Sequence, residues 1–398
     1  MEIFRNRKSF LMGFAAGILL MVVGVISFGL LDRQMRWGGN ISPNNKITEI
    51  FTLLESYSII PFEREILLQN MYRGLLDGVG DPYTHYFDPV ALEAFHIRTE
   101  GMFVGIGVLV MMDPVDRTVT IATAYEGAPA AQAGLMPGDR IVNIDGRDVV
   151  GRSLEEVTNL IKGPEGSTVG VTVLRPGTGE RINVDIVRTQ VSIPTVFHEM
   201  LPEGTGYIRI EGFDKVTTEQ FVEAMQNLRR ENMHSLIIDL RNNPGGLLDV
   251  VVDIANVFLP PGIITYTEDV NGSRRYFKAD ENYINIPLVV LVNGRSASAS
   301  EVFAGAVQDT GVGTIVGETT FGKGIVQNIF GLTDGSAVKM TVAKYFTPNG
   351  TSIHGTGLLP DVVVEMDEHL GMRIGRISIE EDVQLQTALG LVQAIVRD

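Results

Sequence analysis

The order of apolar and polar positions sets the first 31 residues apart from the rest of the chain. Residues 9–31 contain no charged side chain and are rich in Leu, Val, Ile, Met, Phe and Gly. At about 1.5 Å per helical residue, such a run spans about 30 Å, the thickness of a bilayer core. Arg5, Arg7 and Lys8 precede the run, and positive charge keeps that side in the cytoplasm. We predict a cytoplasmic tail over 1–8, a single transmembrane helix over 9–31, and an extracytoplasmic body in the periplasm or at the cell exterior.

A cleaved signal peptide is the alternative for this run. Its apolar region would be about 7 to 15 residues long and would end at a small-x-small cleavage site. The run here is longer, and no Ala-x-Ala lies near its end. Both observations favour an uncleaved anchor.

Helical spacing of apolar residues follows a polar Gly, Asn and Pro linker that we place at 32–45. Over 46–95 the spacing predicts two amphipathic helices separated near Pro61. The apolar faces of such helices are either packed core or a dimer surface. The sequence is therefore compatible with a homo-oligomer.

Alternating strand and helix patterns fill the second half of the chain. Short apolar, β-branched runs at 235–240, 287–292 and 314–317 are typical of buried parallel strands. Helical spacing covers 217–230, 247–259 and 299–308, and a strand at 337–346 and a helix at 382–396 follow. A right-handed βαβ crossover makes 287–292 and 314–317 parallel and places them as neighbours.

Composition narrows the classes of function. The chain has 398 residues, 44% of them apolar, which is enough for more than one domain. A net charge of −16 argues against binding nucleic acid through bulk electrostatics. The absence of cysteine excludes thiol catalysis and thiolate metal sites, and the six histidines show no ligand spacing. We expect no metal and no cofactor.

Ser298 and Lys323 each follow one of the predicted parallel strands. Both should therefore lie at the carboxyl edge of one sheet, where open α/β sheets carry their sites. A serine needs a base to take its proton, and a lysine serves only if burial lowers its pKa from about 10.4. Gly322 and Gly324 would let neighbouring backbone approach Lys323 closely.

Structural interpretations compete with this chemistry. Ser298 and Glu301 also fit a capping box, in which the serine only caps a helix. Lys323 between glycines is also typical of a turn. The glycine turn at 241–246 follows the strand at 235–240 and leads into a helix. It is either an oxyanion hole built on free N–H groups or only a tight βα turn.

Two segments resemble the active-site signature of the carboxyl-terminal processing proteases, a family of PDZ-containing serine proteases. They are N-G-R-S-A-S-A-S-E at 293–301 and G-E-T-T-F-G-K-G-I-V-Q at 317–327. The resemblance implies that Ser298 is the nucleophile, Lys323 its base, and Gln327 the residue that orients the lysine. It implies oxyanion donors at the N–H groups of Ala299 and of a glycine, Gly245 as first choice and Gly246 as second. His354 is then structural.

Two further segments extend the resemblance towards the N-terminus. G-D-P-Y-T-H-Y-F at 80–87 is similar to the segment that precedes the PDZ domain in this family, and 127–146 is similar to a PDZ signature. A PDZ domain accepts a C-terminal peptide as an added strand and holds its carboxylate on backbone N–H groups. Leu154–Ile161 would line that groove. The loop that holds the carboxylate would be formed by Val104, Gly105, Ile106 and Gly107.

The resemblance covers residues 46–398 and implies an α/β, crotonase-like protease core with an inserted PDZ domain. We expect a helical region at 46–95, the PDZ domain at 101–188, the core at 189–365 and a C-terminal helical segment at 366–398. The expected function is a membrane-anchored serine endopeptidase that cuts protein substrates near free C-termini.

We add one hypothesis on how the protease is regulated and consider two alternative functions. A hinge at 189–194 would let the PDZ domain act as a lid. A proteolytically inactive PDZ adaptor at the membrane is the non-enzyme alternative, and the intact Ser298, Lys323 and Gln327 speak against it. An esterase would normally show a G-x-S-x-G motif, which is absent around Ser298.

Overall fold

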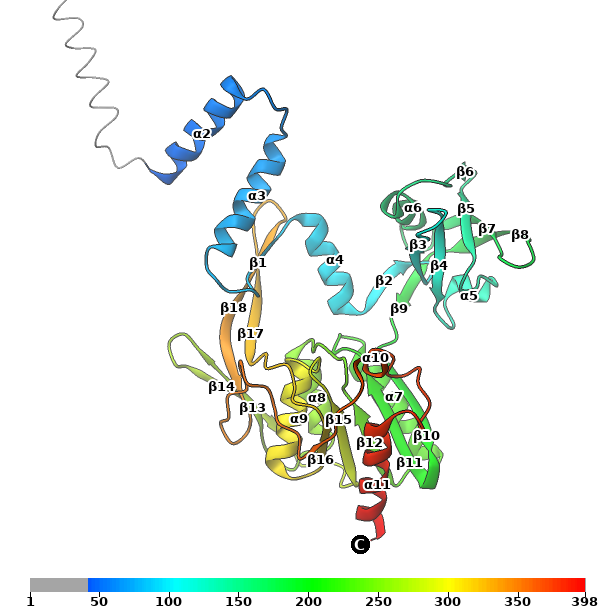
Figure 1. Cartoon of the computed structure of the whole chain (residues 1–398), viewed down its shortest axis with the longest axis vertical. Coiled ribbons are helices and arrows are strands. Elements are labelled where there is room, and N and C mark those ends of the chain that lie inside the picture. Colours follow the sequence, from blue (N-terminus) through cyan, green and yellow to red (C-terminus); the bar gives the residue numbers. More distant parts are fainter. Residues whose placement is uncertain (1–41, 398) are drawn as a thin grey trace, which may run out of the picture. The chain divides into compact units, whose positions relative to one another are not determined.

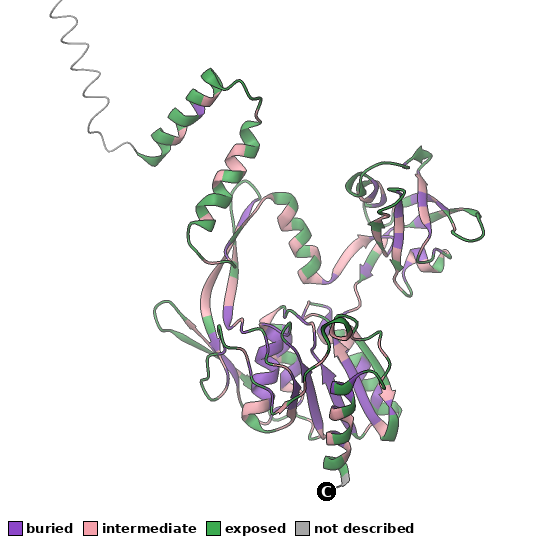
Figure 2. Ribbon diagram, viewed as in Figure 1, coloured by how far each residue is buried: buried purple, intermediate pink, exposed green. Residues whose placement is uncertain are grey.

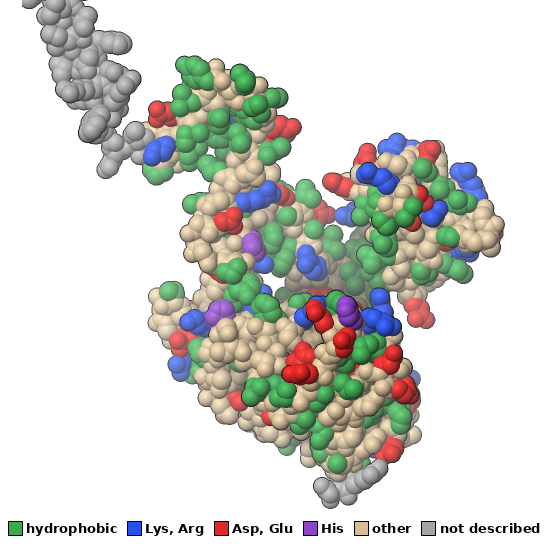
Figure 3. All heavy atoms as spheres, in the orientation of Figure 1, with side chains coloured by type: hydrophobic (Ala, Val, Ile, Leu, Met, Phe, Trp, Pro, Cys, Tyr) green, Lys and Arg blue, Asp and Glu red, His purple; other side chains and the backbone are tan. Residues whose placement is uncertain are grey.

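A computed structural model describes residues 42–397, and the chain divides into two compact units, 1–70 and 71–398. The first unit contains helix α2 (Pro43–Tyr57) and the start of α3 (Arg64–Asp77), with Pro61 between them as predicted. Pro43 occupies the first turn of α2, so the expected linker at 32–45 ends three residues too late. Phe51 is the one buried residue of α2, and apolar side chains lie on the visible surface of this unit (Figure 3).

The second unit begins with strand β1 (His85–Phe87) and helix α4 (Pro89–Glu100). The Asp88 side chain caps α4 by accepting from the Ala91 N–H, and Gly101 ends the helix at a φ of 67°. Strand β1 therefore interrupts the region expected to be helical over 46–95. Within residues 42–397, no helix is both long and apolar enough to cross a membrane. The predicted transmembrane segment at 9–31 lies outside the described residues.

A small β domain with its own core follows α4. Its sheet has the strand order β3-β4-β5-β7-β8, with β6 paired to β5, so β3 is an edge strand. Helix α6 (Leu154–Ile161) begins with a capping box between Ser153 and Glu156, and it packs against β3 and β5. The remaining elements are β3 (Val108–Met112), β4 (Val119–Ala124), α5 (Pro129–Gln132), β5 (Arg140–Ile144), β6 (Arg147–Asp148), β7 (Thr168–Leu174) and β8 (Arg181–Val187).

A two-stranded ribbon carries the chain into and out of this domain. Strand β2 (Met102–Gly105) pairs antiparallel with β9 (Thr189–Ser192), and the Ile193 N–H donates to the Gly101 carbonyl at 2.7 Å. The Gln220 side chain holds the base of the ribbon by donating to the Ile193 carbonyl and accepting from the Thr195 N–H. The segment expected to be a single hinge is therefore half of a paired ribbon.

The core of the second unit is a six-stranded sheet in the order β10-β11-β12-β15-β16-β19. Strands from β11 to β19 run parallel, and β15 and β16 are neighbours as predicted. Figure 2 shows that buried residues concentrate in these strands. The strands are β10 (Val196–Leu201), β11 (Thr205–Ile210), β12 (Ser235–Asp239), β15 (Leu288–Val292), β16 (Thr314–Gly317) and β19 (Val362–Val363).

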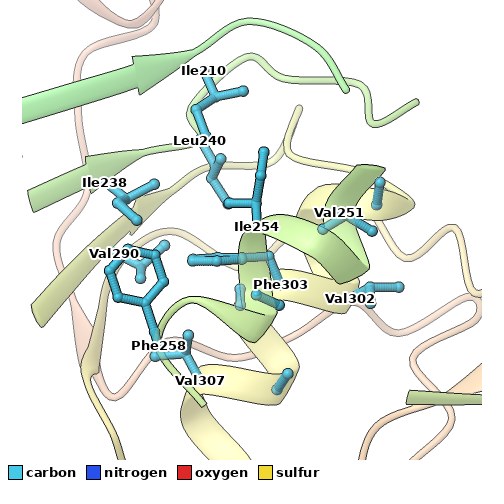
Figure 4. Close-up of a cluster of buried hydrophobic side chains, with 14 of the residues drawn as sticks. Ile210, Ile238, Leu240, Val251, Ile254, Phe258, Val290, Val302, Phe303 and Val307 are labelled. Atoms are coloured by element: carbon cyan, nitrogen blue, oxygen red, sulfur yellow. The ribbon is translucent and has the colours of Figure 1, made fainter. Parts of the chain in front are cut away.

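Helices cover both faces of this sheet (Figure 1). On one face, α7 (Thr217–Arg230), α8 (Leu248–Asn256) and α9 (Ala299–Thr310) pack on alternate residues of the strands. Figure 4 shows Phe258 and Phe303 meeting Ile238 and Val290 in this layer. On the other face, α11 (Val383–Arg397) buries Leu385, Ala388 and Val392 against Ile237, Val289, Leu291 and Val316. The C-terminal helix therefore completes the core.

A second, antiparallel sheet stands beside the first. Its order is β1-β18-β13-β14, and β17 also pairs with β18. Its strands are β13 (Gly262–Asp269), β14 (Arg274–Ala279), β17 (Ile325–Gly331) and β18 (Ala337–Phe346). The chain segment after β16 passes from the carboxyl edge of the parallel sheet directly into β17. This passage contains residues 318–324 and hence Lys323.

Candidate active site

Ser298 stands on a sharp turn between β15 and α9. Its backbone has a φ of 56° and a ψ of −113°, a conformation that costs a non-glycine residue about 1 to 3 kcal/mol. Such strained strand-to-helix turns lift a nucleophilic side chain above the end of a sheet. The turn therefore presents the Ser298 hydroxyl at the carboxyl edge, where the sequence predicted it.

Two buried serines flank Ser298 at a spacing of two and tie its turn to the loop after β12. The Ser296 hydroxyl donates to the Leu240 carbonyl at 2.8 Å, and the Ser300 hydroxyl donates to the Asn243 carbonyl at 3.0 Å. Both serines are fully buried. The serines thus occupy the positions that glycines take in G-x-S-x-G turns, and their hydroxyls add fixed bonds to the neighbouring loop.

The buried carboxylate of Glu301 joins the Ser298 turn to the Lys323 loop. It accepts hydrogen bonds from the backbone N–H groups of Ser298 at 2.8 Å and Lys323 at 2.9 Å. It also accepts from the Gly322 N–H at 2.7 Å and the Thr320 hydroxyl at 2.6 Å. The interaction with Ser298 is the half of a capping box in which the glutamate reaches back. Here the same carboxylate also fixes the second loop, a role that the sequence did not reveal.

Lys323 is half-buried in a loop whose glycines are required for packing. A Cβ on Gly322 would lie 2.8 Å from the Gly357 N, and one on Gly324 would lie 2.7 Å from the His354 N. Burial lowers the pKa of Lys323, against the opposite effects of Asp81 and Glu301. Within residues 42–397, the structure has no hydrogen bond between the Lys323 ammonium and the Ser298 hydroxyl. Instead, Lys323 Nζ lies over the Tyr83 ring, 4.9 Å from its centre.

Gln327 lies on β17, near the lysine loop but with a different partner from the one expected. Its side-chain amide donates to the Tyr83 carbonyl. Tyr83 therefore contacts both the lysine and the glutamine, a position that no sequence pattern indicated.

The glycine turn after β12 lies against the Ser298 turn. A Cβ on Gly245 would be 2.8 Å from the Ser298 Cβ and 2.9 Å from the Ala299 N, so only glycine fits. The Gly245 N–H donates to the Asn243 side chain at 2.8 Å. For the N–H groups of Gly246 and Ala299, the structure has no acceptor among the described residues. The turn thus brings together all three predicted oxyanion donors, one of them already bonded.

Tyr345 supports the nucleophile from β18, and the sequence did not single it out. Its hydroxyl donates to the Ser298 carbonyl at 2.9 Å, and its backbone N–H donates to the Gly324 carbonyl at 3.2 Å. Burial raises the pKa of Tyr345 well above its usual range, and Glu301 adds to this. The hydroxyl therefore stays protonated and serves as a permanent donor.

Arg241, which the sequence did not single out either, holds the start of the glycine turn after β12 through buried ion pairs. Its guanidinium contacts Asp239 at 2.6 Å and Asp382 at 2.8 Å, and all three side chains are buried. Tyr207 donates to the same Asp239 at 2.7 Å. Because Asp382 directly precedes α11, the ion pairs connect the C-terminal helix to the carboxyl end of β12.

The loop predicted to hold a peptide carboxylate begins as a strand. Val104 and Gly105 belong to β2 and pair with Gln190 and Thr189, and Ile106 is buried. Gly107 has a φ of 79°, and a Cβ there would lie 2.2 Å from the Ala128 Cβ. The loop leads directly into the open edge of β3.

His354 is exposed, and its backbone packs against Gly324. No hydrogen bond joins its ring to Ser298 within residues 42–397. Over the same residues, no three His, Asp or Glu side chains are placed to hold a metal ion. Among the described residues, the groups that contact the Ser298 turn include the Glu301 carboxylate, the Tyr345 hydroxyl and the backbone of Gly245.

Comparisons with known proteins identify the family of this chain. The model of peptidase family S41 matches residues 204–364, and a PDZ domain model matches 120–175. A carboxyl-terminal-processing protease of Synechocystis sp. is 36% identical over 85% of this chain and 80% of its own. Carboxy-terminal processing protease CtpB of Bacillus subtilis is 33% identical over 86% of this chain and 71% of its own.

Among solved structures, a photosystem II D1 C-terminal processing protease is 35% identical to this chain. The similarity covers 79% of this chain and 86% of that one, with a TM-score of 0.47. Sequence identities of 36% and 33% over most of this chain and of both relatives assign the family. This chain belongs to the carboxyl-terminal processing proteases, serine peptidases of family S41 with a PDZ domain.

Proposed function

We propose that this peptidase cleaves protein substrates near their C-termini through a Ser298 and Lys323 dyad. The observation that carries the proposal is the Glu301 carboxylate, which accepts from the backbone N–H groups of both residues at 2.8 and 2.9 Å. A single buried acceptor thereby fixes the distance between the two turns. Preorganisation of this kind is what a nucleophile and its base require.

The chemical steps follow from the protonation state of the lysine. Neutral Lys323 removes the proton of the Ser298 hydroxyl as the oxygen attacks the scissile carbonyl. The Ala299 N–H and the glycine turn at Gly245 or Gly246 hold the oxyanion. The Lys323 ammonium then protonates the leaving amine, and the neutral lysine activates water to release the acyl group. Gln327 orients the lysine during these steps.

Point variants test the dyad. Ser298→Ala and Lys323→Ala should each abolish peptide cleavage without unfolding the protein, and the double variant should lose no more than either single one. Ser273→Ala and Lys278→Ala, at exposed positions of the β13 and β14 hairpin, are matched controls. Near-normal cleavage by folded Lys323→Ala would exclude the lysine as the base.

We propose further that the PDZ domain captures the free C-terminus of the substrate along β3. The support is an edge strand whose Leu109 and Met111 are about half exposed, next to α6 and beyond the Gly107 turn. A peptide that adds antiparallel to β3 would satisfy the unpaired edge, and its carboxylate would meet the turn N–H groups. Ser298→Ala protein should bind a peptide with an apolar C-terminal residue, and should bind its C-terminal amide much more weakly. Equal affinity for acid and amide would show that the carboxylate is not recognised.

The location of the enzyme is the last part of the proposal. We infer that residues 9–31 anchor the chain in a membrane, with the peptidase on the extracytoplasmic side, because the uncharged run follows three basic residues. After an alkaline carbonate wash, the full-length chain should remain in the membrane fraction. Mature N-termini that begin beyond residue 31 would instead identify a cleaved signal peptide.

A further inference from the structure

The segment at 80–84 contacts the proposed catalytic base, although its sequence lies about 240 residues upstream. The Tyr83 ring lies under Lys323 Nζ at 4.9 Å, and the Tyr83 carbonyl accepts the side-chain amide of Gln327. One half-buried residue therefore contacts both the lysine and the glutamine proposed to orient it. The peptidase reaction as described above uses neither the ring nor this carbonyl.

Asp81 holds Tyr83 in place through three hydrogen bonds. Its carboxylate accepts from the Tyr83 N–H at 3.0 Å, from the Thr84 hydroxyl at 2.6 Å and from the Thr341 hydroxyl at 2.7 Å. Thr341 lies on β18 directly opposite Gln327 on β17. The Asp81 carboxylate thus ties the segment to the same pair of strands that carries Gln327, and β1 continues this attachment by pairing with β18.

We propose that Tyr83, fixed by Asp81, is a positioning residue for the general base: its ring seats the Lys323 side chain and its carbonyl sets the Gln327 amide. The inference rests on the proposed dyad. The flat ring restricts the flexible lysine stem and shields its amine from water, and the neighbouring carboxylate sets the local charge.

Opposing influences act on the protonation of Lys323. Burial has the largest effect and lowers the pKa of Lys323, while Asp81 and Glu301 raise it. Lys339 on β18 is another cation nearby: burial, then Lys323 and Arg98, lower its pKa, and Asp81 raises it. Against the effect of burial, hydrogen bonds from Thr84, Thr341 and Tyr83 lower the pKa of Asp81, and the charge of His85 on β1 adds to this. Loss of the Tyr83 ring removes the shielding that favours the neutral amine and the ring face that favours the ammonium, and the loss of shielding prevails because burial has the largest effect on this pKa.

Two substitutions should therefore shift the reaction in opposite directions along the pH axis. Tyr83→Ala exposes the amine to water, so we expect the pKa of Lys323 to rise and the acid limb of kcat to move to higher pH. Asp81→Asn keeps the shape but removes a negative charge, so the acid limb should move to lower pH. At neutral pH, Tyr83→Ala should lower kcat about tenfold or more and change KM much less, since the base acts in the chemical step.

The measurements are pH profiles of peptide cleavage and a direct titration of Lys323. The titration uses ¹³Cε-labelled lysine in the full chain, with the Lys323 resonance identified by its loss in Lys323→Arg. Tyr83→Phe keeps the ring, so its acid limb should stay at the wild-type pH, whereas that of Tyr83→Ala should be displaced. Tyr276→Ala removes a half-exposed tyrosine on β14 and serves as the control for loss of a ring elsewhere.

Specific outcomes decide the matter. If folded Tyr83→Ala and Asp81→Asn both keep the wild-type midpoint of the Lys323 resonance and of the rate profile, the inference is overturned. Equal losses of activity and thermal stability with no change in either midpoint would overturn it as well, because they indicate a purely structural role. Activity in Lys323→Ala would refute the dyad itself, whereas the Lys323 resonance would still report whether Tyr83 and Asp81 control the lysine.

Discussion

At Ser298 the backbone is held in a conformation that the residue would not adopt by itself. The φ of 56° is offset by fixed partners on both sides, namely the Glu301 carboxylate on the N–H and the Tyr345 hydroxyl on the carbonyl. Buried hydrogen bonds of this kind are each worth about 0.5 to 1.5 kcal/mol, and more when one partner is charged. Together they are of the right size to hold a strained turn.

Removing the Tyr345 hydroxyl should therefore loosen the nucleophile without removing any reacting group. We expect Tyr345→Phe to fold and to lower the acylation of Ser298 about fivefold to thirtyfold, which corresponds to about 1 to 2 kcal/mol. The rate of labelling by a fluorophosphonate probe measures this step directly. Tyr283→Phe, at a partly exposed position, is the control. An unchanged labelling rate in Tyr345→Phe would mean that Glu301 alone maintains the turn.

Asp214 is a second residue held in an unfavourable state. It lies in the loop that follows Phe213, whose backbone is bonded to the oxyanion turn at Gly245. Burial raises the pKa of Asp214 to about 6, although Arg98 acts in the opposite direction. The folded protein therefore binds a proton more tightly here than the unfolded chain does.

This pKa predicts how stability changes with pH. Between about pH 4 and 6 the folded state keeps the proton that the unfolded state loses, so rising pH removes stability there and has no further effect above. Asp214→Asn should raise the free energy of unfolding by about 1 to 2 kcal/mol at pH 7.5, after allowance for solvent screening of this half-buried group. Denaturant titrations at pH 4 should show little gain. Asp253→Asn, exposed on α8, controls for loss of charge, and an equal gain at both pH values would contradict the assignment.

At the scale of elements, the sequence predicted the buried strands and amphipathic helices well. β16 was predicted at its observed bounds, because TIVG is a short β-branched run buried on both sides. Helix α7 and strand β18 were also predicted at the bounds they have in the structure. Periodicity is strong where an element is fully covered.

The remaining elements and contacts carry no such local signal. The β13 and β14 hairpin shows no regular alternation of exposed and buried positions, and most of β14 is exposed, including Arg274 and Arg275, so its pattern is weak. The contact of Tyr83 with Lys323 joins distant parts of the chain, and so do the ion pairs of Arg241 with Asp382. Such contacts are specified by the tertiary fold, and no spacing rule within a segment reports them. For Glu301, the sequence predicted the capping interaction with Ser298 but not the hydrogen bonds to the Lys323 loop.

Helix α11 is attached to the parallel sheet by its buried face and by an ion pair at its start. It covers one face of the parallel sheet, and Asp382 at its start pairs with fully buried Arg241. Asp382→Ala would leave the guanidinium with one carboxylate and should cost about 3 to 5 kcal/mol of stability. Urea unfolding followed by circular dichroism measures this loss, with Asp253→Ala as the exposed control. A cost below about 1 kcal/mol would show that Asp239 alone satisfies the arginine.

For the whole molecule, the N-terminal segment and the catalytic body are expected to be separable. Every group proposed to act in cleavage lies in the second unit, which begins at Met71. Deletion of residues 1–31 should give a soluble protein that retains peptide cleavage, as measured by kcat/KM on a fluorogenic peptide. A folded but inactive truncation product would show that the segment does more than locate the enzyme.

The ribbon of β2 and β9 also has a consequence for how such a chain can be built and diversified. Because Gly101 and Ile193 are hydrogen-bonded neighbours at 2.7 Å, the peptidase body presents two adjacent ends to whatever is inserted between them. The domain inserted at this point adds about 90 residues between the two ends, which stay next to each other. The entropic cost of closing so long a loop is therefore offset by the folding of the inserted domain itself. Replacing the PDZ domain with another peptide-binding domain would therefore leave the two ends of the peptidase body next to each other.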